Sequence, residues 1–460
     1  MNSGSQATWW RPQSLPGGGL RSEDARPRDV GPAVSAVPFW ALMAFTIILI
    51  LAPQTYFKSL APLRVGWIAA GVATVTYLLD RLVHRGPLTV VTRETRAAAG
   101  LAVWAILTVP WSYWPGGSVA FLLTAYFKTL VIFCLLANVV TTLERLKAIV
   151  WGLSLMAAPL AVYGIAQYRS GGFVADGAMS RIASYEAPLT QNPNDLALTL
   201  NLILPLTAAL FLARRTLPSR AALAGLMALD AAAIVVTFSR AGFLTLGATL
   251  LIYIGRLMKR PERGWAITAI VLALLSFPLL PASYLQRLST ISNIEADTTG
   301  SAQARWADTI AAVRYVVRHP VVGAGVGMNV LALNEVRGPA WKEVHNVYLQ
   351  HAVDLGVPGL VLFLVLLTGC LRTAGEVRRR TAGIPAHREL FCLAEGIQIS
   401  LAAFSVAALF HPVAYHFYFY YIAGLALALR AASRPSNTRG THSESDLTLP
   451  RPSSQTGRGL

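Results

Sequence analysis

The 460-residue chain has few charged residues: Asp, Glu, Lys and Arg make up 13% of it, whereas 54% of its residues are hydrophobic. Soluble domains carry about 25% charged residues, so this composition excludes a soluble globular protein and indicates a membrane-embedded one. Cysteine is also scarce. The three cysteines, Cys134, Cys370 and Cys392, all lie in apolar runs. Their number and placement exclude a disulfide framework and a cysteine-based metal site.

The sequence also lacks the patterns that bind a catalytic divalent ion. It has no His-Glu-x-x-His motif, no clustered aspartates and no Cys/His arrangement with metal-ligand spacing. We therefore expect neither a metal ion nor another cofactor. No internal repeat suggests the inverted halves of a transporter. Residues 1–36 are polar and have no apolar segment typical of a signal peptide, so we expect this tail, like residues 433–460, to be disordered and cytoplasmic.

Apolar runs dominate the rest of the chain. A membrane-spanning helix needs about 20 mostly apolar residues, and about twelve segments approach this length. The pattern predicts an all-α polytopic membrane domain over residues 37–432, with a large periplasmic loop at about 282–344 between the ninth and tenth spans. The expected span cores are 38–53, 65–80, 97–112, 118–138, 147–166, 195–213, 221–237, 241–257, 264–281, 357–372, 389–410 and 413–431.

The distribution of positive charge predicts the orientation. The net charge of +17 could indicate a nucleic-acid-binding protein, but the basic residues gather in short clusters between apolar runs. If the N-terminus is cytoplasmic, most loop lysines and arginines fall in cytoplasmic loops, as the positive-inside rule requires. We therefore expect both termini inside the cell, a multi-pass protein of the plasma membrane, and membrane lipids rather than nucleic acid as its surroundings.

The long outer loop has structure of its own. Residues Ser301–Arg318 have the periodicity of an amphipathic helix, which Pro320 ends. Its apolar positions near one face are Trp306, Ile310, Val313 and Val317. Three alternating glycines follow, Gly323, Gly325 and Gly327. They allow either a tight turn or a close approach of the backbone to a ligand, and the pattern does not separate these interpretations.

Several cations lie on the outward side, where the charge bias predicts few. The outer loop contains Arg305, Arg314, Arg318, Arg337 and Lys342. This excess suggests an anionic ligand, although solvated helix charges would explain most of them.

Arg240 stands in a very short connection between the seventh and eighth spans, at the outer membrane interface. A charge there is costly unless it is paired or used, and the alternative is an arginine that snorkels to lipid headgroups. Arg181 lies in a polar stretch ahead of Asn192, Asn194 and Asp195, and the last two also fit a capping role at a helix start. Lys128 lies within the fourth span, and we expect it to face the protein interior near an anionic group.

His345 stands where the outer loop enters the tenth span, and Asn346 follows it. An imidazole there is neither buried in lipid nor free in bulk water, which suits a general base for a substrate carried by the bilayer. The alternative is a histidine that only contacts backbone atoms or lipid headgroups. His351 projects from a different helix face, so the two histidines do not form a metal site. We interpret His411 and His416, at the last outer loop, as part of an interfacial belt.

These residues resemble motifs of the bacterial O-antigen ligase and polymerase superfamily, and O-antigen ligases most of all. The resemblance covers about residues 97–430. Four segments carry it in order: Gln191–Ala197, Phe238–Gly242, Arg305–Trp306 with His319–Gly325, and Glu343–Leu349 with Gly356–Gly359. It implies a GT-C-like inner-membrane glycosyltransferase whose donor is a glycan on undecaprenyl diphosphate.

The resemblance also implies residue roles. Arg240 and Arg305, with Arg181 as a weaker candidate, would bind the donor diphosphate, and His345 would be the base. Supporting residues would be Asn346, Asn192, Asn194 and Lys128. The chemistry is consistent, because arginine can stabilise a leaving diphosphate without a metal, and an imidazole of pKa near ~6.5 can accept a hydroxyl proton.

The expected reaction is an inverting, metal-independent transfer from undecaprenyl diphosphate to an outward-facing acceptor such as lipid A–core of lipopolysaccharide. The alternatives are an O-antigen or exopolysaccharide polymerase and a protein O-oligosaccharyltransferase, which share the donor. A polysaccharide or lipid transporter is the alternative from another class. The polar residues gather on one side of the membrane and not at its midplane, which favours an enzyme.

Overall fold

The computed structural model describes residues 35–60, 62–176, 179–182, 185, 187–279 and 300–434. The two expected disordered tails therefore lie almost entirely outside the described residues, and so does the part of the outer loop at 280–299.

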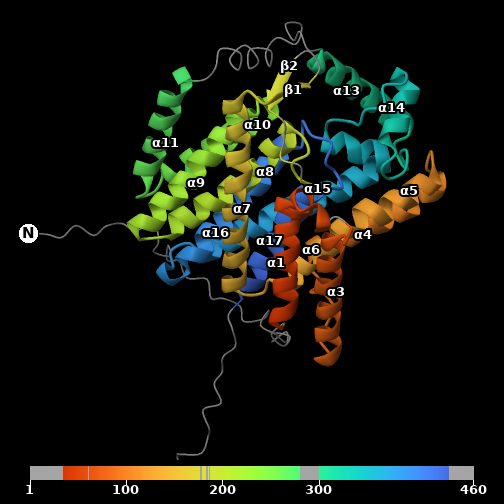
Figure 1. Ribbon diagram of the computed structural model, residues 1–460. Helices are drawn as coiled ribbons and strands as arrows, with labels where there is room; N and C mark the ends of the chain where they lie inside the picture. The colour runs from red at the N-terminus through yellow and green to blue at the C-terminus, as the bar shows by residue number, and fades with distance from the viewer. Residues whose placement is uncertain are drawn as a thin grey trace, which may run out of the picture.

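The described chain is almost entirely helical, as predicted (Figure 1). The α-helices are α1 Ala36–Leu51, α2 Pro53–Tyr56, α3 Val65–Val83, α4 Arg93–Leu107, α5 Pro115–Phe121, α6 Phe127–Val139, α7 Leu143–Ser170, α8 Pro193–Ala213, α9 Leu217–Val236, α10 Arg240–Leu257, α11 Arg263–Ser276, α13 Ser301–Arg318, α14 Asn329–Arg337, α15 Val347–Thr381, α16 Arg388–Ala407 and α17 Phe417–Ala432. Short 3-10 turns lie at Lys58–Leu60, Val109–Trp111, Phe277–Leu279 and Pro385–His387, and a π-helical stretch at Leu122–Tyr126 joins α5 to α6.

One element departs from the all-α prediction. Strands β1, Phe173–Asp176, and β2, Met179–Ile182, form an antiparallel hairpin after α7. The hairpin, α13 and α14 lie at one end of the helix bundle, the upper end in Figure 1. The polar stretch that contains the hairpin has no helical periodicity, and its four-residue strands are too short to give a strand pattern in the sequence.

Each of the twelve expected span segments coincides with a helix of the structure. Within the described residues, six helices are long and apolar enough to cross a membrane: α5 with α6, α7, α8, α9, α15 and α16. Three shorter apolar helices, α1, α11 and α17, accompany them. The chain is therefore a multi-pass membrane protein.

The core is centred on α8, which packs against α7, α9, α10 and α16. All of its residues from Leu196 to Leu212 are buried. A helix that is apolar on every side cannot face water, so its neighbours must enclose it. This central position fixes the start of α8 firmly at the upper end of the bundle.

Three helices begin at the upper end with a side-chain cap. Asn192 caps α8, Ser239 caps α10 and Asn346 caps α15. In each case a side-chain oxygen accepts a backbone N–H of the first turn, which satisfies a donor that would otherwise lack a partner. The caps explain why these helices begin at the motifs found in the sequence.

Helix α15 is broken at Gly356, whose φ of 69° and ψ of −174° are not helical. The segment between α13 and α14 fills the break. Val357 N donates to Pro320 O at 2.7 Å, and Ala324 N donates to Val353 O at 2.8 Å. Backbone groups on both sides of the break therefore have partners in this segment, as buried backbone requires.

The alternating glycines permit this docking. Gly323 has φ of 73°, and a Cβ there would lie 2.6 Å from Val353 O. A Cβ on Gly325 would overlap Ser112, and one on Gly327 would overlap Phe121. The close approach left open by the sequence is thus an approach to the protein's own backbone and side chains.

Helix α13 has the bounds that the sequence predicts, but its apolar face is not the packed one. Trp306 is 59% exposed and Val317 is 74% exposed. The buried face instead carries Ala311, Ala312 and Tyr315, which contact α14 and α15. Small residues let α13 lie close to α15, which the hydrophobic periodicity alone did not indicate.

We expect Gly356→Ala to destabilise the protein by about 1–3 kcal/mol, because the added Cβ would overlap Val321 O and a left-handed backbone disfavours alanine. Thermal unfolding in detergent measures the change. Gly247→Ala in α10 is the matched control, since nothing lies within 4 Å of its Cβ position. Equal melting temperatures for the two variants would contradict this account of the break.

Candidate active site

The two arginines predicted to bind a diphosphate lie together at the upper end. Arg240 is the first residue of α10, and its Nη2 donates to Ser301 Oγ at 2.8 Å. Ser301 is the first residue of α13, and Arg305 follows it by one helical turn. Residues four apart lie on neighbouring positions of one helix face. This hydrogen bond therefore holds the start of α10, which carries Arg240, beside the start of α13, which carries Arg305.

His345 lies two residues before α15. Its Nδ1 is 3.0 Å from Glu343 O. A carbonyl oxygen can only accept, so Nδ1 donates and the proton of the neutral ring is held there. The lone pair then resides on Nε2, which is the atom that could take a proton from a substrate hydroxyl.

The electrostatic surroundings keep His345 neutral. Burial lowers its pKa to about 4, and the positive charge of Arg305 contributes to the same direction. The hydrogen bond to Glu343 O acts in the opposite direction. At neutral pH the imidazole is therefore in the form that a general base needs. The charge of Arg305 thus acts on His345, the predicted base.

Arg181 has a different position from the one expected for a diphosphate ligand. It is 2% exposed, and its Nε and Nη2 donate to Thr237 O at 3.1 and 2.8 Å. Nη2 also donates to Asn194 Oδ1 at 3.1 Å. These bonds tie the hairpin to the turn before Arg240 and to the start of α8. The geometry supports a positioning role for Arg181 over direct contact with the donor.

Two of the three asparagines, Asn192 and Asn346, cap helix starts. Asn192 Oδ1 accepts from Asn194 N and Asp195 N at 2.9 and 3.0 Å, so Asn192 is the cap of α8. Asn194, the capping candidate from the sequence, instead binds Arg181. Asn346 Oδ1 accepts from Leu349 N at 3.1 Å. Asn346 thus orients the first turn of α15, directly beside His345.

Lys128 is not where the sequence analysis expected it. Its Nζ lies 4.6 Å from the centre of the Trp67 ring of α3, a cation–π contact. Among the ion pairs of the described residues, none includes Lys128. An aromatic face therefore takes the place of the anionic neighbour that was predicted.

His411 belongs to the site, although the sequence suggested an interfacial belt. The ring is buried in the connection between α16 and α17, with Nδ1 2.9 Å from Ala407 O and Nε2 3.4 Å from Asn194 O. Burial lowers its pKa, and the charge of Arg305 lowers it further. His411 thus packs between α16 and the start of α8. In the sequence, only the distance of His411 from the end of the eleventh span could have indicated this position. The same distance also fits a residue of the interfacial belt.

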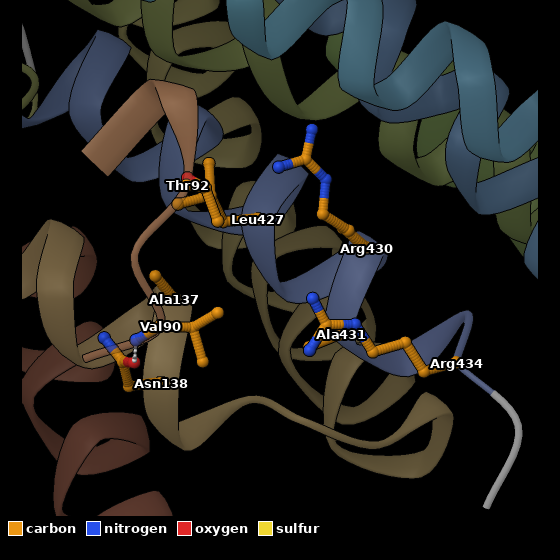
Figure 2. Close-up of a pocket in the computed structure, with 8 residues that line it drawn as sticks. All are labelled: Val90, Thr92, Ala137, Asn138, Leu427, Arg430, Ala431 and Arg434. Carbon is orange, nitrogen blue, oxygen red and sulfur yellow. Dashed lines mark hydrogen bonds between the residues drawn. The ribbon is translucent and has the colours of Figure 1, made fainter. Parts of the chain in front are cut away.

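A small depression lies at the lower end of the bundle, between α6 and α17 (Figure 2). Its volume is about 20 Å³, which is room for about one water molecule. The lining residues are Val90, Thr92, Ala137, Asn138, Leu427, Arg430, Ala431 and Arg434. This space is too small for a glycan or a lipid diphosphate.

The fold and this cluster define a membrane-embedded enzyme with fixed cations and a neutral histidine at one end of a helix bundle. Residues 223–364 match the family described as O-antigen ligase. This region of the chain is similar to that family, which points to an O-antigen ligase-type enzyme. The matched region contains Arg240, Arg305 and His345. No curated protein matches the chain.

The pKa of His345 predicts the pH dependence of transfer. A base must be unprotonated, so kcat/KM for the donor, which reports the enzyme without bound donor, should stay constant as pH falls through 6.5 and decline only toward about pH 4. Arg305→Gln removes a charge that lowers this pKa, so the acid limb should move to higher pH. The control is Arg318→Gln, which removes an exposed charge from the same helix. An acid limb near pH 6.5 in the native enzyme would contradict the prediction.

The two roles assigned to arginine predict different losses. Arg181→Gln should lower the free energy of unfolding by about 1–3 kcal/mol, because it leaves Thr237 O without its buried donors. Arg240→Gln should raise the KM for the donor with a smaller loss of stability. Thermal unfolding and donor titration separate the effects. If Arg181→Gln keeps native stability and loses donor affinity, Arg181 is a direct ligand after all.

Proposed function

We propose that this protein is an O-antigen ligase that transfers a glycan from undecaprenyl diphosphate to lipid A–core of lipopolysaccharide. The observation that carries the proposal is the cluster of Arg240, Arg305 and a neutral His345 at one end of a multi-pass helix bundle. Each member supplies one requirement of the reaction: fixed positive charge for the leaving diphosphate and a base for the attacking hydroxyl.

The proposed reaction is a single displacement. The acceptor oxygen forms a bond to the anomeric carbon while the bond from that carbon to the diphosphate oxygen breaks, which inverts the configuration. His345 Nε2 takes the hydroxyl proton, and undecaprenyl diphosphate leaves as an anion. Arg240 and Arg305 stabilise the charge that develops on the diphosphate, with fork-shaped donors suited to phosphate oxygens. No metal ion has a role in this scheme.

The membrane arrangement that we propose has twelve spans, with both termini in the cytoplasm and the site at the periplasmic face of the inner membrane. Its support is the distribution of charge along the bundle. The lower end carries dense arginine clusters at the ends of α10 and α15, as a cytoplasmic face does. In this scheme residues 1–36 and 433–460 are cytoplasmic tails on a single membrane domain, 37–432.

The start of α8, α10 and α15 at the upper end gives further support. Each helix begins there with its positive dipole end; α10 begins at Arg240, and α15 begins two residues after His345. Helix N-termini favour anions by their aligned N–H groups. A lipid diphosphate would therefore meet backbone dipoles and arginine charges of the same sign. A transporter would need polar groups near the membrane midplane instead.

The acceptor is tested by in vitro transfer from a purified lipid-linked glycan, with lipid A–core, a second lipid-linked unit and a peptide offered separately. We expect glycan on lipid A–core, and EDTA should leave the rate unchanged. Elongated lipid-linked glycan would identify a polymerase, and a glycopeptide would identify a protein-modifying enzyme. Strict dependence on Mg²⁺ would contradict the arginine mechanism.

We expect His345→Ala to lower the transfer rate by about 10²–10⁴-fold, because the acceptor hydroxyl loses its base. The protein should keep its native melting temperature, since the side chain is only half-buried. His387→Ala is the matched control, an exposed histidine at the lower end. Undiminished transfer by the His345 variant would remove the residue from the proposed role.

A further inference from the structure

A cationic cavity lies at the lower end of the bundle, far from the site just described. Its volume is about 400 Å³, within the range of small-molecule sites. The residues that line it are Gly255, Arg256, Lys259, Arg260, Arg378, Arg379, Ala382 and Phe391. Arg256 lies 16 residues after Arg240 on α10, which corresponds to about 24 Å along the helix. The two cationic sites are therefore separate.

A single buried carboxylate organises this cavity. Glu395 of α16 is fully buried, with a side chain 1% exposed, and Arg260 Nη1 and Nη2 donate to its two oxygens. Arg256 Nη1 is 3.4 Å and Arg378 Nη1 is 3.8 Å from Glu395 Oε1. Arg256 is also held by Gln398, whose Oε1 accepts from its Nη2 at 3.0 Å. The guanidinium groups are thus fixed in position before any ligand binds.

The cavity holds more positive charge than Glu395 can balance. Five cations line it, and three of them share this one carboxylate. Arg378 Nε is buried without a hydrogen-bond partner among the described residues. Like charges gathered at low dielectric repel one another, and an unpaired buried donor is costly. A bound anion would relieve both penalties.

Two simpler explanations account for only part of the arrangement. The positive-inside rule explains why cations lie at this end, and the dipoles of α10 and α15 favour cations in their last turns. Neither requires cations from two helices to converge on a carboxylate contributed by a third. Neither explains a concave space beside them.

The position of the cavity on α10 favours a lipid as the source of the anion. Leu251 and Met258 lie seven residues apart on one helix face, and both are exposed. Gly255 and Lys259 lie between that face and Arg256, and nothing lies within 4 Å of a Cβ on Gly255. An acyl chain along Leu251 and Met258 would bring its headgroup over this open position. Basic pockets between membrane helices are known to suit anionic headgroups.

We propose that this cavity binds the phosphate group of an anionic phospholipid of the membrane leaflet at the lower end. Arg256, Arg260 and Arg378, fixed by Glu395, would contact the phosphate oxygens, and Lys259 and Arg379 would add charge at the cavity mouth. The inference does not depend on the glycosyl transfer proposed above, because it concerns a different end of the bundle and a different ligand.

The test is native mass spectrometry of the full chain with phosphatidylglycerol, with phosphatidylcholine as the neutral comparison. The native protein should retain phosphatidylglycerol selectively. The double variant Lys259→Gln with Arg379→Gln should lose affinity roughly fivefold for each removed charge. These two residues do not take part in the contacts with Glu395, so the fold should persist. The matched control is Arg85→Gln with Arg215→Gln, two exposed cations elsewhere on the chain.

Inorganic phosphate separates the two possible sources of the ligand. Retention of phosphatidylglycerol that millimolar phosphate does not displace supports a lipid headgroup site. Binding of phosphate alone, lost in the Lys259 and Arg379 double variant, supports the same phosphate site with a soluble anion and overturns the lipid assignment. Equal lipid retention by the native protein and this double variant, or an equal loss in the control, overturns the proposal.

Discussion

The backbone hydrogen bonds between the break in α15 and the segment that follows α13 are the constraint on which the rest of the site depends. The break at Gly356 interrupts the helical hydrogen bonds, and Pro320 O and Ala324 N supply partners for backbone groups on either side of it. The same docking holds α13 against the first part of α15. Arg305 lies on one of these helices and His345 precedes the other, so a backbone requirement places a cation beside the base.

That proximity has a chemical consequence. The charge of Arg305 and the burial of the ring keep His345 unprotonated, while the hydrogen bond to Glu343 O leaves Nε2 as the proton acceptor. A bound diphosphate would neutralise part of the charge on Arg305 and raise the pKa of His345 toward its ordinary value. The base would then become stronger when the donor is present. The two proposed functions of the site would thus be coupled through one electrostatic interaction.

Hydropathy predicted the helical segments because a membrane selects apolar residues at every turn, whatever their partners. The motif order also indicated Arg240, Arg305 and His345, which the fold brings together. Tertiary partners decided the rest. The sequence could not show that Arg181 is buried against Thr237 O, because its acceptor is a distant carbonyl. Likewise, the exposed apolar face of α13 follows from small residues that pack on α15, and periodicity alone does not rank one face above the other.

The most direct test of the central claim is a structure of the protein with a bound undecaprenyl diphosphate glycan. The account predicts diphosphate oxygens within hydrogen-bonding distance of Arg240 and Arg305, with the anomeric carbon open to an acceptor on the Nε2 side of His345. A diphosphate bound at the lower end, or one whose sugar lies away from His345, would contradict it.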